Sequence, residues 1–340
     1  VLFNSGSSAN LAMLQTYLNL GKLQKGDKVG FSALTWSTNA MPIIQLGMEP
    51  VPIDCDPSTL NCMSHNLEKT LQETPIKAFF ATNVLGFCGD LGTIKSLCDE
   101  RDILFIEDNC ESMGTVLNGT KTGSYGNSGS FSFYVAHHMS TIEGGMVCTD
   151  DHEVGDMLRM VRAHGWDRNL PQQTRQRLHE KYNLDSEFKA NYTFYDLGYN
   201  LRPTEITGFL GLNQLQYVEK SNQHRHNMYQ FLDSSIKQNS DLIAPNFSHI
   251  EFLSCFATPV IAKSTSLRDK YIAKFQKAEI EIRPIIAGNI QNQPFFQKYV
   301  GSNYALPGAD LLEHNGFYCG LYADITDDER AIIESCLVQD

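Results

Sequence analysis

The chain has 340 residues, 42% of them hydrophobic, and its 27 Lys and Arg residues are outnumbered by 39 Asp and Glu, giving a formal net charge of −12. This acidic balance argues against a nucleic-acid partner, because binding to a polyanion needs an excess of positive charge. No run reaches the roughly 18 apolar residues of a membrane helix, and nine cysteines without a Cys-x-x-Cys pair indicate reduced thiols in a cytoplasmic protein.

Short apolar runs alternate with helical stretches along the first half of the chain. A helix is predicted over residues 10–20, entered from a serine-rich loop whose residues suit an N-cap. Apolar runs over residues 77–82, 103–107, 130–134 and 145–149 predict buried strands. This alternation is typical of an α/β fold with a mostly parallel sheet covered by helices.

The second half of the chain has a different pattern. Residues 172–195 are charged and polar, and we expect them to pass over the surface. Residues 207–219 have a helical pattern that would connect to a second, smaller α/β unit. We therefore predict a large domain over residues 1–215 and a smaller one over residues 216–340, since the length exceeds that of a usual single domain.

Ser7 and Ser8 stand where a helix is expected to begin. Hydroxyls and free backbone N–H groups at a helix start bind anions, and the helix dipole favours them. Ser132, at the end of a predicted strand, would add a third hydroxyl. Taken without further motifs, the serine pair is more typical of an ordinary N-cap.

Two ionisable residues follow predicted strands. Asp108 closes the run 103–107, which places its carboxylate at the carboxyl edge of a parallel sheet, where α/β proteins bind ligands; a helix cap is the alternative. His137 has an imidazole suited to proton transfer near neutral pH, although a lone histidine is often structural. The neighbouring His138 could suggest a metal site, but no further His, Asp or Glu at helical spacing completes one.

Five motifs follow one another in an order that resembles the DegT/DnrJ/EryC1/StrS family of sugar aminotransferases. They are Asn4-Ser5-Gly6-Ser7-Ser8-Ala9-Asn10, Thr35-Trp36-Ser37-Thr38-Asn39-Ala40, Glu107-Asp108-Asn109-Cys110-Glu111, Ser132-Phe133-Tyr134-Val135-Ala136-His137 with Glu143-Gly144-Gly145, and Gly198-Tyr199-Asn200-Leu201-Arg202-Pro203-Thr204-Glu205. His137 stands where that family has its cofactor-binding lysine. This substitution, with residues 162–168 and 283–289, is similar to a branch of 3-dehydratases that act on nucleotide-linked 4-keto-6-deoxy sugars, with GDP as the expected nucleotide.

The resemblance implies a fold-type I, aspartate-aminotransferase-like fold. It also implies pyridoxal 5'-phosphate or pyridoxamine 5'-phosphate held noncovalently, because an imidazole cannot form the Schiff base that a lysine forms. The implied cofactor contacts are Gly6, Ser7, Ser8 and Ser132 at the phosphate, Trp36 on the ring, Asp108 at the ring nitrogen, Glu111 in place of the commoner Gln, and Asn200 from the partner subunit of a homodimer with shared active sites. The implied substrate contacts are His138, Arg162, Arg168, Arg202 and Arg283.

The implied reaction has two stages and serves cell-surface polysaccharide synthesis. Glutamate, the amino donor in relatives, converts the cofactor to its pyridoxamine form, whose amine joins the C4 ketone of the sugar. His137 then removes a proton from the cofactor methylene and returns one to the departing C3 hydroxyl, and hydrolysis leaves a 3,6-dideoxy-4-keto sugar and ammonia.

Two other functions remain open at this stage: amino-group transfer to a nucleotide sugar, with another residue replacing the lysine, and an inactive scaffold that binds a sugar nucleotide. Family members usually carry an additional segment before the position of Val1. We therefore expect the sequence to lack an N-terminal segment.

Overall fold

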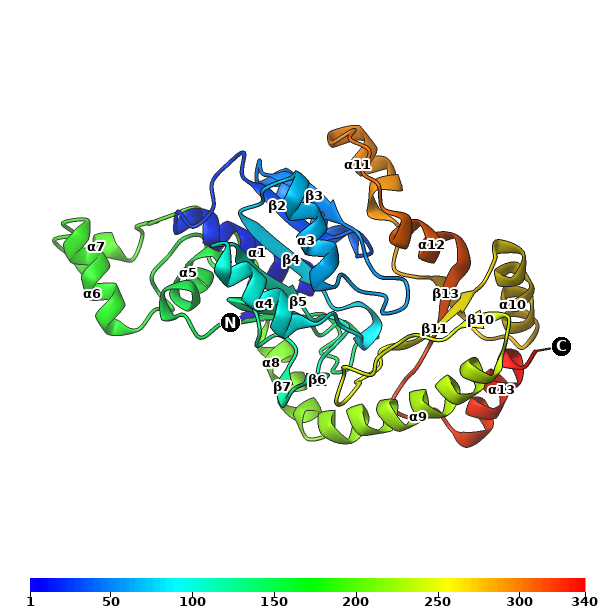
Figure 1. Cartoon of the computed structure of the whole chain (residues 1–340). Coiled ribbons are helices and arrows are strands. Elements are labelled where there is room, and N and C mark those ends of the chain that lie inside the picture. The colour runs from blue at the N-terminus through cyan, green and yellow to red at the C-terminus, as the bar shows by residue number, and fades with distance from the viewer. Residues whose placement is uncertain (340) are drawn as a thin grey trace.

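The computed structural model describes residues 1–339 and contains one large and one smaller β-sheet with flanking helices (Figure 1). The large sheet has the strand order β1-β9-β8-β5-β4-β2-β3. Its strands are β1 (Leu2–Phe3), β2 (Lys28–Ser32), β3 (Glu49–Ile53), β4 (Ala78–Thr82), β5 (Leu104–Asp108), β8 (Ser128–Ser132) and β9 (Gly145–Cys148). Strands β3, β2, β4, β5 and β8 are parallel, and β9 and β1 complete the sheet in antiparallel pairing. The predicted α/β fold with a mostly parallel sheet is confirmed.

The helices of the large sheet are α1 (Gly6–Asn19), α2 (Ser37–Gln45), α3 (Ser64–Glu73), α4 (Leu91–Glu100) and α5 (His152–Arg162). The prediction that α1 begins near residue 10 is wrong, because Ser5 is its N-cap and accepts a hydrogen bond from the Ser8 N–H at 3.1 Å. Ser7 and Ser8 therefore lie in the first helical turn. The strand expected over 130–134 ends at Ser132, where pairing with β9 stops. A turn η1 (Val84–Gly86) and a hairpin of β6 (Val116–Leu117) and β7 (Thr120–Lys121) complete this part.

An arm projects from the large sheet and carries α6 (Gln172–Lys181) and α7 (Glu187–Ala190) (Figure 1). Apart from the buried Ala190, its residues lie at least partly on the surface, as the polar composition of 172–195 predicted. Asp167, which is 1% exposed, holds the arm through Arg175 at 3.5 Å and His179 at 2.7 Å. The helix expected over 207–219 is divided into α8 (Glu205–Leu215) and α9 (Val218–Gln238), because the Tyr217 N–H turns back to the Gln214 carbonyl.

The smaller sheet is antiparallel, with the order β10-β11-β13-β12. Its elements and the helices around it are β10 (Leu242–Ile243), β11 (Ala257–Ala262), α10 (Thr265–Lys277), β12 (Ile282–Pro284), η2 (Ile290–Asn292), α11 (Pro294–Tyr299), α12 (Pro307–Asn315), β13 (Gly316–Gly320) and α13 (Asp327–Leu337). The predicted domain limit at residues 215 and 216 falls where α8 ends. It stays a prediction, because one buried apolar cluster runs from Phe79 of the large sheet to Val260 of the smaller one.

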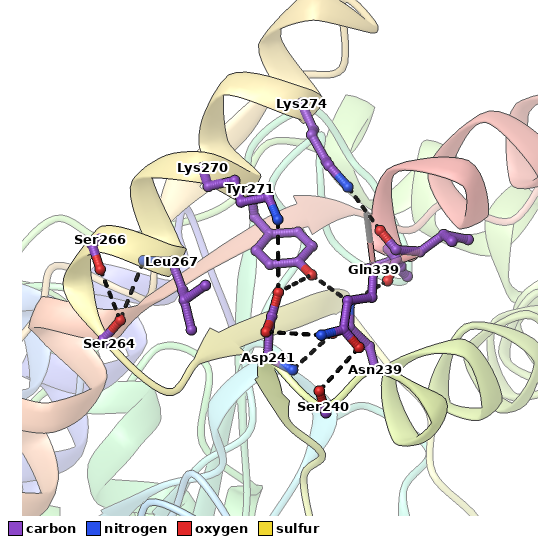
Figure 2. Close-up of polar contacts among 12 residues, drawn as sticks. Asn239, Ser240, Asp241, Ser264, Ser266, Leu267, Lys270, Tyr271, Lys274 and Gln339 are labelled. Atoms are coloured by element: carbon purple, nitrogen blue, oxygen red, sulfur yellow. Dashed lines mark hydrogen bonds and ion pairs between the residues drawn. The ribbon is translucent and has the colours of Figure 1, made fainter.

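A polar network fastens the end of α9 to α10 and to the C-terminal residues (Figure 2). The Asn239 side-chain amide donates to the Tyr271 hydroxyl at 2.6 Å and to the Leu337 carbonyl at 2.5 Å. Asp241 accepts hydrogen bonds from Tyr271 and from Gln339, each at 3.2 Å. These partners belong to the chain itself, so the network has a structural role.

No helix within residues 1–339 combines the length and the apolar character needed to span a membrane. All nine cysteines are free thiols, as expected.

Candidate active site

A cavity of about 540 Å³ opens at the carboxyl edge of β4, β5 and β8. The start of α1, the loop before α2, the segment after β8, and β12 and β13 of the smaller sheet form its walls. The predicted site residues that line it are Gly6, Ser7, Trp36, Asp108, Glu111, Ser132, His137 and Arg283. The tertiary structure thus gathers side chains from the whole length of the chain.

The start of α1 faces Ser132 at one end of this cavity. A Cβ atom added to Gly6 would lie 2.7 Å from the Ser132 Cβ, so only glycine allows this close approach. The start of α1, including Ser7, and Ser132 therefore border one space, which suits an anion such as a phosphate. Ser8 does not line the cavity, and its N–H donates to the Ser5 hydroxyl.

The Asp108 side chain is fixed by three N–H donors. The amides of Asn10 and Asn39 donate to its Oδ2 at 2.8 and 2.9 Å, and the Cys110 N–H donates to its Oδ1 at 2.9 Å. Such a set of donors suits a carboxylate, which accepts but cannot donate. Trp36, which is 58% exposed, lines the same cavity and offers a flat face to a planar ring.

Glu111 has a very different environment from Asp108, three residues earlier. Its Oε2 accepts one hydrogen bond, from the Leu85 N–H at 2.8 Å. Burial, together with the nearby charge of Asp108, raises the pKa of Glu111 to about 8. With this pKa, the protonated form of Glu111 predominates at neutral pH and can donate a hydrogen bond, as the commoner glutamine would.

His137 is held through one ring nitrogen. Its Nδ1 is hydrogen-bonded to the Cys110 carbonyl, so this nitrogen carries the hydrogen, because a carbonyl only accepts. Tyr134 and Phe256 pack on the imidazole, with ring centroids 6.1 and 5.2 Å away. Burial lowers the pKa of His137. The ring is therefore neutral at pH 7, with its Nε2 lone pair free to accept a proton.

His138 lies outside the main cavity and lines an adjoining one of about 460 Å³. Its Nε2 is 3.0 Å from the Ser254 carbonyl, and burial lowers the pKa of His138 to about 3. The two cavities share the residues Ala136, His137, Phe256, Arg283 and Tyr318. His137 thus stands at the junction of both spaces.

Four predicted contacts do not reach the cavity of their own chain: Asn200, Arg162, Arg168 and Arg202. Arg162 donates to the Leu2 carbonyl at 3.0 Å, Arg168 lies 4.0 Å above the Trp166 ring, and Arg202 donates to the Asn200 amide oxygen at 3.0 Å. Arg283 lines the cavity and pairs with Glu281 at 2.7 Å.

Sequence reasoning missed several lining residues, namely Ser5, Thr38, Thr82, Cys110, Tyr134, Phe256 and Tyr318. Ser5, Thr38, Cys110 and Tyr134 lie inside the motifs and could have been found there. Phe256 and Tyr318 come from the smaller sheet, far away in sequence and outside any motif. Within residues 1–339, no lysine lines the cavity.

Residues 1–337 match the model of the DegT/DnrJ/EryC1/StrS aminotransferase family. The GDP-4-keto-6-deoxy-D-mannose 3-dehydratase of Escherichia coli O55:H7 is 33% identical over 327 residues, covering 94% of this chain and 82% of that protein. The lipopolysaccharide biosynthesis protein RfbH of Salmonella typhimurium is 31% identical over 350 residues, covering 97% and 78%.

Comparison with solved structures also finds similarity to GDP-4-keto-6-deoxymannose 3-dehydratases. The Escherichia coli GDP-4-keto-6-deoxy-D-mannose-3-dehydratase with bound hydrated PLP has a TM-score of 0.90 and 32% identity, covering 99% of this chain and 87% of that chain. Two further structures of GDP-4-keto-6-deoxymannose-3-dehydratase, a mutant with bound GDP-perosamine and a form with a trapped PLP-glutamate geminal diamine, have the same TM-score and coverage at 31% identity. These likenesses confirm the predicted aspartate-aminotransferase-like fold.

Proposed function

The chain belongs to the DegT/DnrJ/EryC1/StrS aminotransferase family, and from this premise we propose that it is a 3-dehydratase. It removes the C3 hydroxyl of a GDP-linked 4-keto-6-deoxyhexose and uses pyridoxal or pyridoxamine phosphate as a noncovalent cofactor. The observation that carries the proposal is His137, a neutral imidazole at the position where a lysine would tether the cofactor. An imidazole moves protons but forms no Schiff base with an aldehyde.

The cavity fits this cofactor. Gly6, Ser7 and Ser132 would hold its phosphate, Trp36 would cover its ring, and the Asp108 carboxylate would pair with its ring nitrogen. Bound in this way, the pyridoxamine form supplies a primary amine and a ring that withdraws electrons from the carbon beside it. The amide groups of Asn10 and Asn39 fix Asp108 in the orientation that this pairing needs.

His137 is the proton carrier. The Nδ1–H of His137 donates to the Cys110 carbonyl, so Nε2 is the nitrogen that would take up a proton from the cofactor methylene. The same nitrogen would then donate a proton to the departing C3 hydroxyl. Burial keeps the imidazole neutral before this transfer. Glu111, which is predominantly protonated at neutral pH, adds little negative charge beside Asp108.

The residues that line the two cavities suggest which side chains contact the substrate. Arg283, which lines both cavities, would contact the nucleotide sugar in its own site. Glutamate serves as the amino donor, as the trapped adduct of the related dehydratase suggests. The cytoplasm, where nucleotide sugars are made, is the proposed location, and a lipopolysaccharide sugar is the proposed destination.

A second copy of the chain completes the site. Helix α8 has no buried residue and exposes Ile206, Phe209 and Leu212, each at 66% or more, while the arm exposes Phe188 at 82%. An apolar face of this kind is typical of an interface between subunits. Asn200 lies next to α8 and outside its own cavity, so in a homodimer it would reach the partner's phosphate site.

Mixing two defective variants tests this sharing of sites. His137→Lys and Asn200→Asp should each be inactive as homodimers, whereas mixed dimers should regain activity because one of their two sites contains neither substitution. Phe209→Glu should give monomers in sedimentation, and Tyr299→Glu, an equally exposed aromatic position on α11, should not. Absence of regained activity in mixed dimers would contradict a shared site.

Product analysis tests the reaction itself. The protein is incubated with pyridoxal phosphate, glutamate and GDP-4-keto-6-deoxymannose, and the sugar product is examined by mass spectrometry and NMR. A 3,6-dideoxy-4-keto sugar with release of ammonia is expected. A stable 4-amino sugar that keeps its C3 oxygen would identify an aminotransferase instead, and cofactor binding without turnover of the sugar would leave only a scaffold.

A further inference from the structure

Phe256 lies at the junction of the two cavities and borders both of them. Its ring centroid is 5.2 Å from that of His137 and 6.0 Å from that of His138. Phe256 immediately precedes β11, so a residue of the smaller sheet packs directly on the imidazole that the large sheet supplies.

The backbone of Phe256 is fixed on both sides. Its N–H donates to the Leu85 carbonyl at 2.9 Å, and its carbonyl accepts a hydrogen bond from Arg225 Nη1 at 3.0 Å. Arg225, which is 4% exposed, also donates to the Leu321 carbonyl after β13. Hydrogen bonds on both sides of Phe256 therefore hold the backbone that carries the aromatic ring.

The turn that supports this segment is strained and tightly packed. Leu85 has φ +55°, which is uncommon for a residue with a side chain, and Gly86 follows with φ +95°. A Cβ atom at Gly86 would overlap the Ser254 carbonyl and lie 3.0 Å from the Phe256 nitrogen. Only glycine lets the two backbones approach this closely, and the same Leu85 amide also holds Glu111.

Charged groups near His137 act in opposite directions. Asp108 favours the protonated imidazole, whereas Arg225 disfavours it, and the buried His138 lies alongside. Glu111 and Arg283 border the same cavity. The largest influence on the pKa of His137 is burial, which lowers it.

We propose that Phe256 is a positioning residue for His137: its ring keeps the imidazole in one orientation, with Nε2 toward the cavity, and keeps water away from it. The inference rests on the proposed function of His137 as proton carrier. It explains why the 84–86 turn accepts a left-handed leucine, since that turn places both Glu111 and Phe256.

A graded series of substitutions tests the proposal. Phe256→Leu, Phe256→Val and Phe256→Ala remove progressively more of the cover above His137. Phe252→Ala is the matched control, because Phe252 belongs to the same segment but stacks on His226 at 4.6 Å. Circular dichroism identifies the folded members, and the folded members alone are compared.

The first measurement is the titration of His137 by NMR of its ring nitrogens, in the full chain with and without pyridoxal phosphate. His137→Gln identifies the signal. The midpoint should rise toward the ordinary histidine value of 6.5 along the series, and the fixed Nδ1–H tautomer should give way to a mixture. An unchanged midpoint and tautomer in the folded members would overturn the proposal.

The second measurement is the pH dependence of kcat for the dehydration. Because the neutral imidazole is the active form, the acid limb of the profile should move to higher pH by the same amount as the NMR midpoint. A displacement of one pH unit lowers the rate on that limb about tenfold. If the NMR midpoint of His137 moved but the acid limb of kcat did not, Phe256 would still be the positioning residue. That result would, however, contradict the role of His137 as proton carrier.

Discussion

The cavity around His137 and the polar network around Asp241 both bury polar side chains, but they complete their hydrogen bonds differently. In the network, Asp241 accepts from Tyr271 and Gln339, and the Asn239 amide donates to two oxygens (Figure 2). In the cavity, Glu111 accepts on one oxygen from Leu85, and His137 is held by one nitrogen.

This difference separates a structural polar cluster from a functional one. Groups that find their partners within the chain stabilise the fold, because a buried polar group without a partner costs free energy. Groups at a cavity wall that keep a free atom or a free lone pair are available to a ligand, and this includes the Asp108 carboxylate with its three N–H donors. Substitutions in the cavity should therefore change the reaction, and substitutions in the network should change stability.

The largest effect is expected for His137→Lys. Dehydration should fall by about 10³-fold or more, because the proton carrier is lost. The new amine should form a bond with pyridoxal phosphate that borohydride makes permanent, detectable as an added mass on the peptide. His65→Lys, at an exposed histidine of α3, is the control. It should keep the dehydration rate of the wild type and form no bond with pyridoxal phosphate. Undiminished dehydration would remove His137 from the mechanism.

Asp108→Asn should lower the rate by about 100-fold, because a neutral amide cannot stabilise a protonated ring nitrogen. The comparison is with Asp241→Asn, which alters the same functional group in the C-terminal network. That variant should keep kcat and melt at a lower temperature. If both variants changed kcat alike, the distinction between the two regions would fail.

Glu111→Gln should change the shape of the pH profile. In the wild type, Glu111 loses its proton as the pH rises through about 8, which places a second negative charge beside Asp108. The rate should therefore fall on this alkaline limb, and glutamine, which cannot ionise, should remove the limb. The acid limb, set by His137, should be the same in both proteins. An alkaline limb that persists in the variant would assign it to another group.

The smallest effect is expected for Tyr271→Phe, which removes one hydroxyl from the network. The loss of its hydrogen bonds to Asn239 and Asp241 should lower the free energy of unfolding by about 1 kcal/mol. Denaturant titration measures this change, and kcat should stay as in the wild type. Tyr299→Phe, at an exposed tyrosine, should leave both quantities unaltered.

Much of the fold was predictable because it depends on local patterns. Apolar runs predicted β4 and β5 nearly to the residue, since strands buried on both faces are apolar throughout. The start of α1 was misplaced, because Ser5, and not a residue near position 10, supplies the cap. The break between α8 and α9 left no proline or glycine to mark it.

The candidate site also contains residues that the sequence could place and residues that it could not. Gly6, Asp108 and Ser132 could be placed at one edge of the sheet, because the carboxyl ends of neighbouring strands and the helix that begins there meet at that edge. Phe256 and Tyr318 could not, since no motif surrounds them and only the packing of the smaller sheet brings them to His137.

The sequence by itself determined which functional groups this protein has: an imidazole where an amine would tether the cofactor, and a carboxylate at the end of a strand. Only the tertiary structure decided their protonation. Burial and neighbouring charge act through space, so the environment that lowers the pKa of His137 and raises that of Glu111 exists only when segments distant in sequence are packed together.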